Sequence, residues 1–498
     1  MSTLARVVAL GALCSSAVGL AAPPRYADEV EEKVSCLPAA RPFFHRAWES
    51  LSNLRLDEAR DLFTQTVAVD PACTLAWAQL GALTPGPNGK HMVEDAKAAS
   101  TLLTEVERLQ VLALVAQQRG DHEQALSLVR SALIYSPRSY TLNFGVAQLA
   151  GTLQRWPEMV AAAQHATELA PERGAGWSLL GHAYVGLKQN EQATAAFRHY
   201  AEAAPLEPNA HDSLGDALLA NNRLEQARAA YQRALESSAG TFWVSAHGLA
   251  TVYAIQGDWF SARAAIEKAR HTAPLKDDQL GLMTWTAWSY LADDQPGEAY
   301  RALDELEQDA ARSGLEARVA DARLLRGRFL LAQGRYRDAL TRFIVLGPQR
   351  FPTLTEGQRH SVEAKRLQGM IEANARLGNV ADAEKAFTRL RAMFQARPND
   401  LQGSDAIARA KGQIALQRKD PGGAIQAFSQ CSERFDACKL DLAEAQELSG
   451  QSTAASQTRA LVRVANHRDP EYWWARARAI ERSRDAEPRA QQEDRSAF

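Results

Sequence analysis

The sequence predicts an all-α fold, a right-handed α-solenoid of about twelve helix pairs that ends in a C-terminal capping helix. Two observations predict it. Small residues and prolines recur with a step of 34 residues, and inside each step apolar residues follow the i, i+3, i+4 and i+7 spacing of amphipathic helices. A single helix pair of this kind cannot bury its apolar face alone, so the pairs are expected to stack on one another.

The recurrence is clearest in a regular core over 106–274. Pro137, Pro171 and Pro205 close successive units, because proline cannot continue a helix. In the second helix of each unit, a small or medium side chain lets the paired helices approach closely. The residues at this position are Ala125, Met159, Ala193 and Ala227.

One unit carries the complete pattern W-x2-L-G-x2-Y…A-x3-F…P. Its residues are Trp177, Leu180, Gly181, Tyr184, Ala193, Phe197 and Pro205. This pattern resembles the tetratricopeptide repeat (TPR) family. The stretches 104–114 and 207–236 are most similar to exported, multi-repeat TPR proteins of Gram-negative bacteria. The resemblance implies a scaffolding or binding role.

The array is expected to extend over 40–465. Outside the regular core the step varies, which places extra residues in turns such as 84–90 and 347–357. Near the C-terminus, the stretch EYWWARARAIER sets apolar residues at helical spacing and predicts a capping helix over 466–484 that covers the last apolar face. Residues 485–498 are polar and are expected to be a disordered tail.

Composition excludes one large class of function. Hydrophobic residues make up 46% of the 498 residues and charged residues 23%, as in folded soluble proteins. The formal net charge is -2, whereas a nucleic-acid-binding protein is expected to be clearly basic. We therefore expect no nucleic-acid partner, and the charge gives no reason for attraction to an anionic membrane.

The N-terminus indicates export. Residues 1–21 have the pattern of a secretory signal peptide, with an apolar or small run over 7–21 that follows one arginine. Gly19 and Ala21 are the small residues that signal peptidase needs, and cleavage after Ala21 leaves 22–39 as an N-terminal lead-in. Two alternatives are a lipoprotein modified at Cys14 and an uncleaved anchor.

The apolar run is about fifteen residues, which is short for a transmembrane helix of roughly 20. We therefore expect a periplasmic or secreted protein of the Gram-negative cell envelope, with no membrane span in the mature chain.

Removal of the signal peptide leaves four cysteines, an even number that permits two disulfides in an exported chain. Six residues with an apparent turn separate Cys431 from Cys438, which favours pairing of these two. Cys36 then pairs with Cys73 by elimination. The alternative is four buried free thiols. No C-x-x-C motif suggests a zinc ribbon or a redox site.

Motifs for catalysis are incomplete. GPNGKH at 86–91 lacks the earlier glycine and the following Ser or Thr of a phosphate-binding loop, and DHEQAL at 121–126 lacks the second histidine of a zinc protease. No G-x-S-x-G nucleophile motif is present. The sequence therefore predicts no enzyme, no cofactor and no metal.

Ligand contacts in TPR arrays concentrate on the first helix of each pair, at its second, fifth, ninth and twelfth positions. The resemblance therefore implies a partner-binding groove, placed by counting from the Leu-Gly marks. Its residues are Phe144, Gln148, Ser178, His182, Asn209, Asp212, Asp216, His247, Thr251, Thr284, Trp285, Trp288 and Arg328.

The middle of this groove is expected to be acidic, with imidazoles and with aromatic walls, which suits a basic or amphipathic peptide. The Lys and Asn clamp with which some TPR domains hold a C-terminal carboxylate is absent. The sequence thus predicts a non-catalytic scaffold that binds a protein or peptide partner in its concave groove. One alternative is an envelope assembly or transport accessory that binds a glycan or a lipid-linked substrate. The other is a metal-binding or enzymatic protein.

Individual groove residues also have alternatives. His182 and His247 either hydrogen-bond to Asp212 or Asp216 across adjacent helices, contact a peptide, or bind a metal together with both aspartates. The pair of tryptophans in the groove either packs in the core or contacts a ligand.

Overall fold

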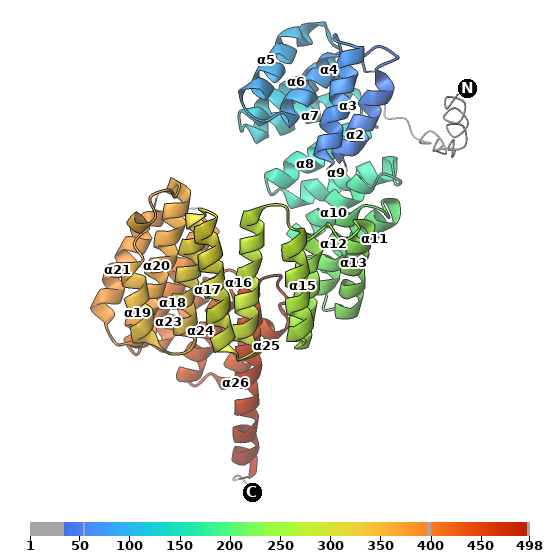
Figure 1. The fold of residues 1–498 in the computed structure, drawn as a ribbon. Helices are drawn as coiled ribbons and strands as arrows, with labels where there is room; N and C mark the ends of the chain where they lie inside the picture. Colours follow the sequence, from blue (N-terminus) through green and yellow to red (C-terminus); the bar gives the residue numbers. More distant parts are fainter. Residues whose placement is uncertain (1–33, 53–54, 396–399, 496–498) are drawn as a thin grey trace, which may run out of the picture. The chain divides into compact units, whose positions relative to one another are not determined.

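The computed structural model describes residues 34–52, 55–395 and 400–495, with side chains up to residue 483 except that of Leu401 (Figure 1). The predicted signal peptide and most of the lead-in lie outside the described residues. The chain divides into two compact units, Met1–Pro205 and Leu206–Phe498.

The described part of the first unit contains ten α-helices and one 3₁₀ turn. These are α2 (Arg41–Ser52), α3 (Leu56–Val69), α4 (Thr74–Leu83), α5 (Pro87–Ala99), η1 (Ser100–Leu102), α6 (Glu105–Gln118), α7 (His122–Tyr135), α8 (Tyr140–Thr152), α9 (Trp156–Leu169), α10 (Gly174–Gly186) and α11 (Asn190–Ala203). Consecutive helices pack as pairs, from α2 with α3 to α10 with α11.

The second unit repeats the arrangement and adds one helix. Its elements are α12 (Pro208–Ala220), α13 (Leu224–Ser237), α14 (Val244–Gln256), α15 (Trp259–Thr272), α16 (Lys276–Ala292), α17 (Pro296–Arg312), α18 (Glu316–Ala332), α19 (Tyr336–Val345), η2 (Pro348–Arg350), α20 (Glu356–Arg376), α21 (Val380–Phe394), α22 (Leu401–Gln417), α23 (Pro421–Phe428), α24 (Asp436–Leu448), α25 (Ser452–Val464) and α26 (Pro470–Arg495). The described residues thus form twelve helix pairs, α2 to α25, and the predicted all-α solenoid is confirmed.

Close approach of paired helices explains the Leu-Gly marks. A Cβ atom on Gly181 of α10 would lie 2.5 Å from the Phe197 ring of α11, and one on Gly215 of α12 would lie 2.5 Å from the Tyr231 ring of α13. Both distances are far shorter than van der Waals contact, so any larger side chain would force the helices apart. The glycine and the aromatic residue sixteen positions later therefore form one packing unit.

The turn predicted over 84–90 is shorter in the structure. Residues 84–86 leave the helix, but Pro87 already begins α5, because a proline in the first helical turn has no N–H to leave unpaired. The expected enlarged turn is therefore wrong at its second half. Later in the chain, the turn predicted over 347–357 consists of η2 and six further residues, 347 and 351–355, up to the start of α20 at Glu356.

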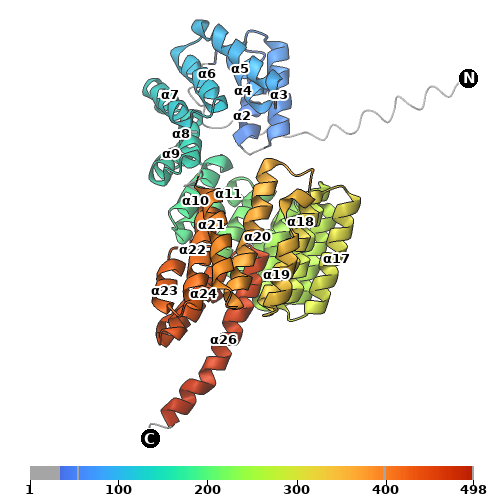
Figure 2. The same ribbon diagram turned by 90° about the vertical axis from the view of Figure 1, so that its left-hand side faces the viewer.

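The C-terminal helix differs from its prediction at both ends. α26 begins at Pro470 rather than at residue 466, since residues 465–469 form the connection from α25. It continues to Arg495, so the disorder predicted from residue 485 onward is not found over 485–495. Figures 1 and 2 show the end of α26 extending away from the helix pairs of the second unit.

All four described cysteines form disulfides. Cys36 is joined to Cys73 in the first unit, with Cα atoms 4.7 Å apart, and Cys431 to Cys438 in the second, with Cα atoms 6.5 Å apart. The first disulfide attaches the segment before α2 to the start of α4. Among the described residues, no helix is both long and apolar enough to cross a membrane.

Candidate peptide-binding groove

The predicted groove residues fall in both units. Four lie on α8 and α10 of the first unit and nine on α12, α14, α16 and α18 of the second. These helices are the first members of their pairs, and the surface they form within each unit is called here the inner face.

On the inner face of the first unit, two of the four predicted residues are exposed. Gln148 and His182 are open to solvent, and the His182 ring meets Phe197 edge-on at 5.1 Å between centroids. Phe144 and Ser178 are buried, and Phe144 stacks on Tyr140. The first unit therefore offers a polar inner surface, without the aromatic wall that Phe144 was expected to provide.

On the inner face of the second unit, the predicted residues meet the C-terminal end of the same chain. The connection after α25 and the first half of α26, residues 466–483, are called here the C-terminal segment. α26 packs on α14, α16, α24 and α25. The sequence predicted only a cap on the last helix pair, whereas the C-terminal segment also reaches the first pairs of this unit.

Arg468 binds the acidic part of the groove. Its Nη1 lies 2.8 Å from Asp216 Oδ1 and 3.3 Å from Asp212 Oδ2, and its guanidinium lies 5.4 Å from the centroid of the Tyr231 ring. A further hydrogen bond runs from Nη2 to the Val244 carbonyl. Arg468 thus contacts a carboxylate pair, a carbonyl and an aromatic face at once, which makes it the central anchor of the segment.

Two hydroxyl groups of the second unit also hold the carboxylates of Asp212 and Asp216. Ser245 Oγ donates to Asp212 Oδ1 at 2.7 Å, and the Tyr231 hydroxyl donates to Asp216 Oδ1 at 2.6 Å. Burial and then Asp216 raise the pKa of Tyr231 well above its ordinary value, so this hydroxyl stays protonated. Burial lowers the pKa of Arg468, but the two carboxylates outweigh burial and raise it above its ordinary value.

Aromatic residues hold the next part of the segment. Trp473 is 2% exposed, and its ring meets Trp285 edge-on at 5.2 Å and lies 6.4 Å from Trp259. The His247 ring stacks on Trp285, with the ring centroids 4.1 Å apart and an interplanar angle of 5°. Offset and edge-on aromatic contacts of this kind add to the free energy of simple burial.

His247 plays a different role from the one expected. It does not bond to Asp212 or Asp216, and its Nε2 is buried without a hydrogen-bond partner among the described residues. Burial, and secondly Arg468, lower its pKa to about 3, so the ring is neutral at pH 7. The expected ties between histidine and aspartate are therefore wrong here. The structure gives no support to a metal site made of His182, His247 and the two aspartates. His182 lies in the first unit, and Arg468 binds the carboxylates of Asp212 and Asp216.

The last predicted aromatic is also covered. Trp288 is buried against Phe329 at 4.8 Å between centroids, and the Trp474 ring lies 6.4 Å away. The Arg328 guanidinium lies 5.6 Å from the Trp288 centroid and forms an ion pair with Glu471 of the segment. Trp288 is thus part of the packed groove and offers no open stacking surface.

Three of the predicted residues form no hydrogen bond, ion pair or ring contact with the C-terminal segment among the described residues. Thr251 is fully buried, and its hydroxyl donates to the His247 carbonyl at 2.9 Å. The Thr284 hydroxyl donates to the Gly281 carbonyl at 2.6 Å. Asn209 lies partly exposed in the first turn of α12. The hydroxyl groups of both threonines therefore form hydrogen bonds within their own helices.

The C-terminal segment also contributes residues that the sequence did not single out. The Asn466 amide donates to the Leu219 carbonyl at 3.2 Å and to Asn222 Oδ1 at 3.0 Å, and His467 Nδ1 lies 2.6 Å from Asp436 Oδ2. The one available signal was the aromatic cluster at 472–474, which is larger than the cap of a single helix pair needs.

Family comparisons agree with this architecture. Two family models, both described as tetratricopeptide repeat, match residues 80–240 and 370–431, one in each half of the helix-pair array. The chain therefore contains tetratricopeptide repeats over these residues. No curated protein sequence matches it.

Solved TPR structures resemble parts of the chain at low identity. MamA from Desulfovibrio magneticus RS-1 is 17% identical over 35% of this chain and 97% of its own, with a TM-score of 0.33. A TPR protein from Parabacteroides merdae is 15% identical over 54% of this chain and 93% of its own, with a TM-score of 0.32. Pseudomonas aeruginosa pilF is 16% identical over 49% of this chain and 96% of its own, with a TM-score of 0.31.

Beyond the groove, charged residues of the TPR first helices form a second, partly buried network. Arg409 of α22 lies 2.7 Å from Asp441 of α24 and 3.2 Å from Glu372 of α20, and Arg376 pairs with Glu444 at 2.6 Å. Burial lowers the pKa of Arg409, but Asp441 and Glu372 outweigh it and raise the pKa. Because every charge has an opposite partner, this network ties successive TPR pairs together.

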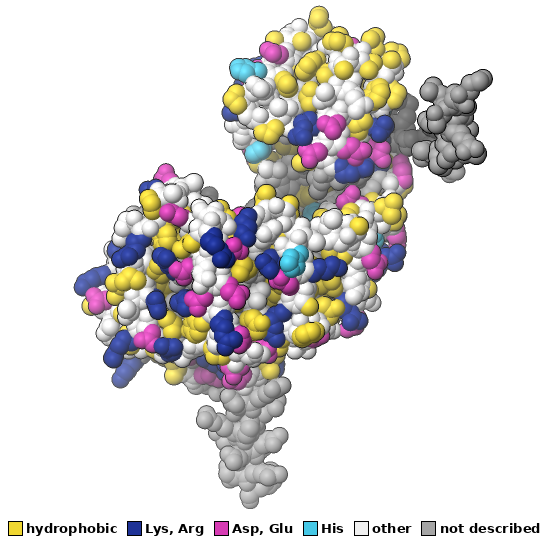
Figure 3. All heavy atoms as spheres, in the orientation of Figure 1, with side chains coloured by type: hydrophobic (Ala, Val, Ile, Leu, Met, Phe, Trp, Pro, Cys, Tyr) yellow, Lys and Arg dark blue, Asp and Glu magenta, His cyan; other side chains and the backbone are white. Residues whose placement is uncertain are grey.

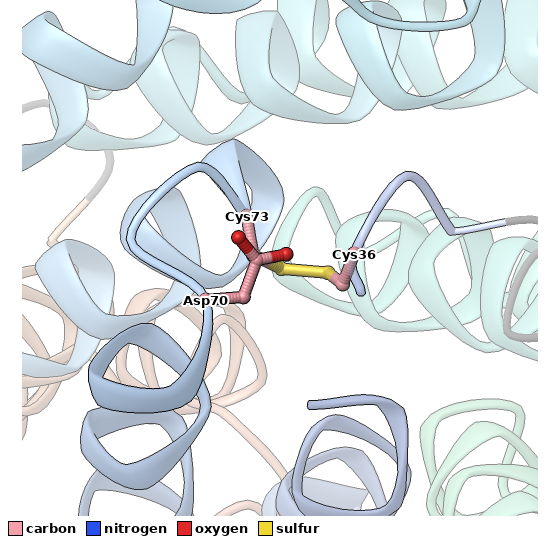
Figure 4. Close-up of side chains that lie close together, drawn as sticks. All are labelled: Cys36, Asp70 and Cys73. Atoms are coloured by element: carbon pink, nitrogen blue, oxygen red, sulfur yellow. A yellow bond between two sulfur atoms is a disulfide. The ribbon is translucent and has the colours of Figure 1, made fainter. Parts of the chain in front are cut away.

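Among the described residues, one group combines three possible metal ligands, Cys36, Asp70 and Cys73 (Figure 4). Both sulfurs belong to the disulfide. The Asp70 carboxylate accepts hydrogen bonds from the Leu37 N–H at 2.6 Å and the Ala72 N–H at 3.0 Å. The group therefore fastens the segment before α2 to the TPR array.

Proposed function

We propose that this TPR protein is a non-catalytic scaffold that binds a protein or peptide partner along the inner faces of its helix pairs. The observation that carries the proposal is the groove of the second unit. It holds a peptide segment, and it does so through Asp212, Asp216, Trp285 and Arg328, which lie at the ligand positions of TPR helices.

A partner from outside meets the inner face of the first unit. Gln148, His182 and Val185 present exposed side chains on α8 and α10. Together they offer an amide, an imidazole and an apolar contact, a mixture suited to a peptide backbone with small apolar side chains.

Surface charge supports a protein partner. In Figure 3, Lys and Arg side chains alternate with Asp and Glu over the second unit, and no large basic area appears on the face shown. Nucleic-acid binding depends on a continuous basic footprint.

We also propose that the protein works in the cell envelope. The pattern of residues 1–21 supports export, and two disulfides suit an oxidising compartment. N-terminal sequencing of the protein from its native cells tests this: the mature chain is expected to begin at or near Ala22, and a chain that retains Met1 would contradict cleavage of a signal peptide.

Cross-linked capture from the envelope fraction tests partner binding. The double variant Gln148→Ala/His182→Ala is expected to recover at least tenfold less partner than wild type. The matched control is His165→Ala, which removes an exposed histidine from α9, the second helix of its pair. Equal recovery with the double variant would show that the inner face of the first unit does not bind the partner.

A further inference from the structure

The groove of the second unit is a complete peptide site, and its occupant defines the chemistry that it accepts. Arg468 enters the carboxylate pair, Glu471 meets Arg328 three residues later, and Trp473 enters the aromatic cluster two residues after that. Each anchor has a groove partner of complementary chemistry, from three different TPR first helices.

The occupant belongs to no helix pair, and its buried side chains, such as Tyr472 and Trp473, pack on the core of the second unit. The helix pairs from α12 to α25 are complete without α26. Only residues 465–469 connect it to α25. A terminal segment that completes no pair can detach without opening any other pair, and segments of this kind open at lower free energy than the core.

The fit also leaves polar atoms unused. His247 Nε2, Trp473 Nε1 and Arg478 Nε are buried without a hydrogen-bond partner among the described residues. A buried donor or acceptor without a partner costs free energy that a better ligand can recover. The C-terminal segment therefore fits the groove closely but incompletely.

From these observations we propose that the groove of the second unit is a receptor for a partner helix that follows an arginine and carries a glutamate and two adjacent aromatic residues. The C-terminal segment occupies this site within the chain as a competitor, and the partner binds when it takes the segment's place. The inference rests on the proposed scaffold function and adds the chemistry of the partner and its regulation.

The test uses full-length protein and a fluorescein-labelled peptide of residues 464–483. Wild type is expected to bind the peptide weakly, because its own segment fills the groove. Arg468→Ala/Trp473→Ala weakens the segment but keeps the groove, so this variant is expected to bind the peptide at least tenfold more tightly in fluorescence anisotropy. Adding Asp212→Asn/Asp216→Asn to that variant is expected to abolish the gain.

Equal binding by wild type and by the folded double variant would overturn the proposal. A wild-type dimer in light scattering that the double variant no longer forms would also overturn it, since the segment of a second copy would then be the occupant. Partner capture by the first unit is measured separately with Gln148→Ala/His182→Ala, so loss of peptide binding alone leaves the scaffold function standing.

Hydrogen exchange of wild-type protein provides a second measurement that needs no variant. The amides of α26 over 470–480 are expected to exchange together, and at least tenfold faster than those of α14 and α16. If they exchange only at the rate of those helices, the segment opens only on global unfolding and cannot be displaced by a partner.

Discussion

The two ends of the TPR array are closed by different chemistry. At the N-terminal end, the segment before α2 is fastened by the Cys36–Cys73 disulfide, and Ser35 donates two hydrogen bonds to the buried Glu107 of α6. At the C-terminal end, ion pairs and aromatic contacts hold the segment. A covalent attachment is permanent in an oxidising compartment, whereas the second attachment is an equilibrium.

This difference teaches that terminal segments of a repeat array can serve two purposes. Both cover apolar surface that has no further repeat to pack on. The C-terminal segment additionally contacts Asp212, Asp216 and Trp285, which are residues of the predicted partner groove. The following four variants test the contrast, in order of expected effect.

The largest effect is expected for Trp473→Ala. Removal of this buried ring leaves a cavity between Trp259 and Trp285, and large-to-small substitutions of this kind cost about 4 kcal/mol. Urea denaturation followed by tryptophan fluorescence measures the change. The matched control is Phe260→Ala, an exposed aromatic on α15, for which a change below about 0.5 kcal/mol is expected. Equal effects would show that the aromatic cluster does not hold the segment.

The next effect is expected for Cys36→Ser/Cys73→Ser. This disulfide closes a loop with a sequence separation of 37, so its loss is expected to destabilise the first unit by about 3 kcal/mol. Limited proteolysis with mass spectrometry then shows cleavage before α6 and none in α14 or α16. Cys431→Ser/Cys438→Ser, with a separation of 7, is expected to cost less. Proteolysis that spreads to both units would deny their independence.

Arg468→Ala is expected to destabilise the second unit by up to about 3 kcal/mol, because Asp212 and Asp216 lose their shared cation while Asp212 stays buried. The midpoint of thermal unfolding reports the loss. Arg228→Ala removes an ion pair on the surface of α13, where a change below about 1 kcal/mol is expected. If adding Asp212→Asn/Asp216→Asn to Arg468→Ala restores wild-type stability, the uncompensated carboxylate charge causes the loss of stability. If stability is not restored, that charge is not the cause.

The smallest effect depends on pH. His247 has a pKa of about 3 when folded and about 6.5 when unfolded, so the unfolded chain binds one more proton between these values. Stability therefore falls as the pH drops through 6.5, by up to about 2 kcal/mol from pH 7 to pH 5. His247→Phe keeps a ring on Trp285 and is expected to remove this part of the pH dependence. An unchanged pH profile of unfolding would contradict a neutral, buried His247.

The sequence predicts the fold well because each helix pair repeats the same short-range requirements. Gly181 needs Phe197 and Gly215 needs Tyr231, and both pairs are sixteen residues apart, so the pattern recurs along the chain. The ligand positions, which are placed by counting along each first helix, stay a prediction; two of them, Asp212 and Trp285, contact the C-terminal segment.

The occupant of the groove could not be predicted in this way. The contact of Asn466 with Leu219 spans 247 residues and has no periodic signature. Arg468 lies in a short connection, where a charged residue is unremarkable in sequence terms. The tryptophans that follow it suggest a cap because adjacent residues form the last helix pair, whereas only the three-dimensional path of the chain brings Trp473 to Trp285.

The position of the occupant at the end of the chain sets an order of events during synthesis. Residues 208–292, which form α12 to α16, are synthesised about 180 residues before Arg468. At a typical elongation rate of roughly 5–20 residues per second, Asp212, Asp216 and Trp285 wait on the order of ten seconds or more for their own ligand. During that interval these groove residues lack their contacts with the C-terminal segment, so the carboxylate pair and the aromatic cluster are completed only by the last part of the chain to be made.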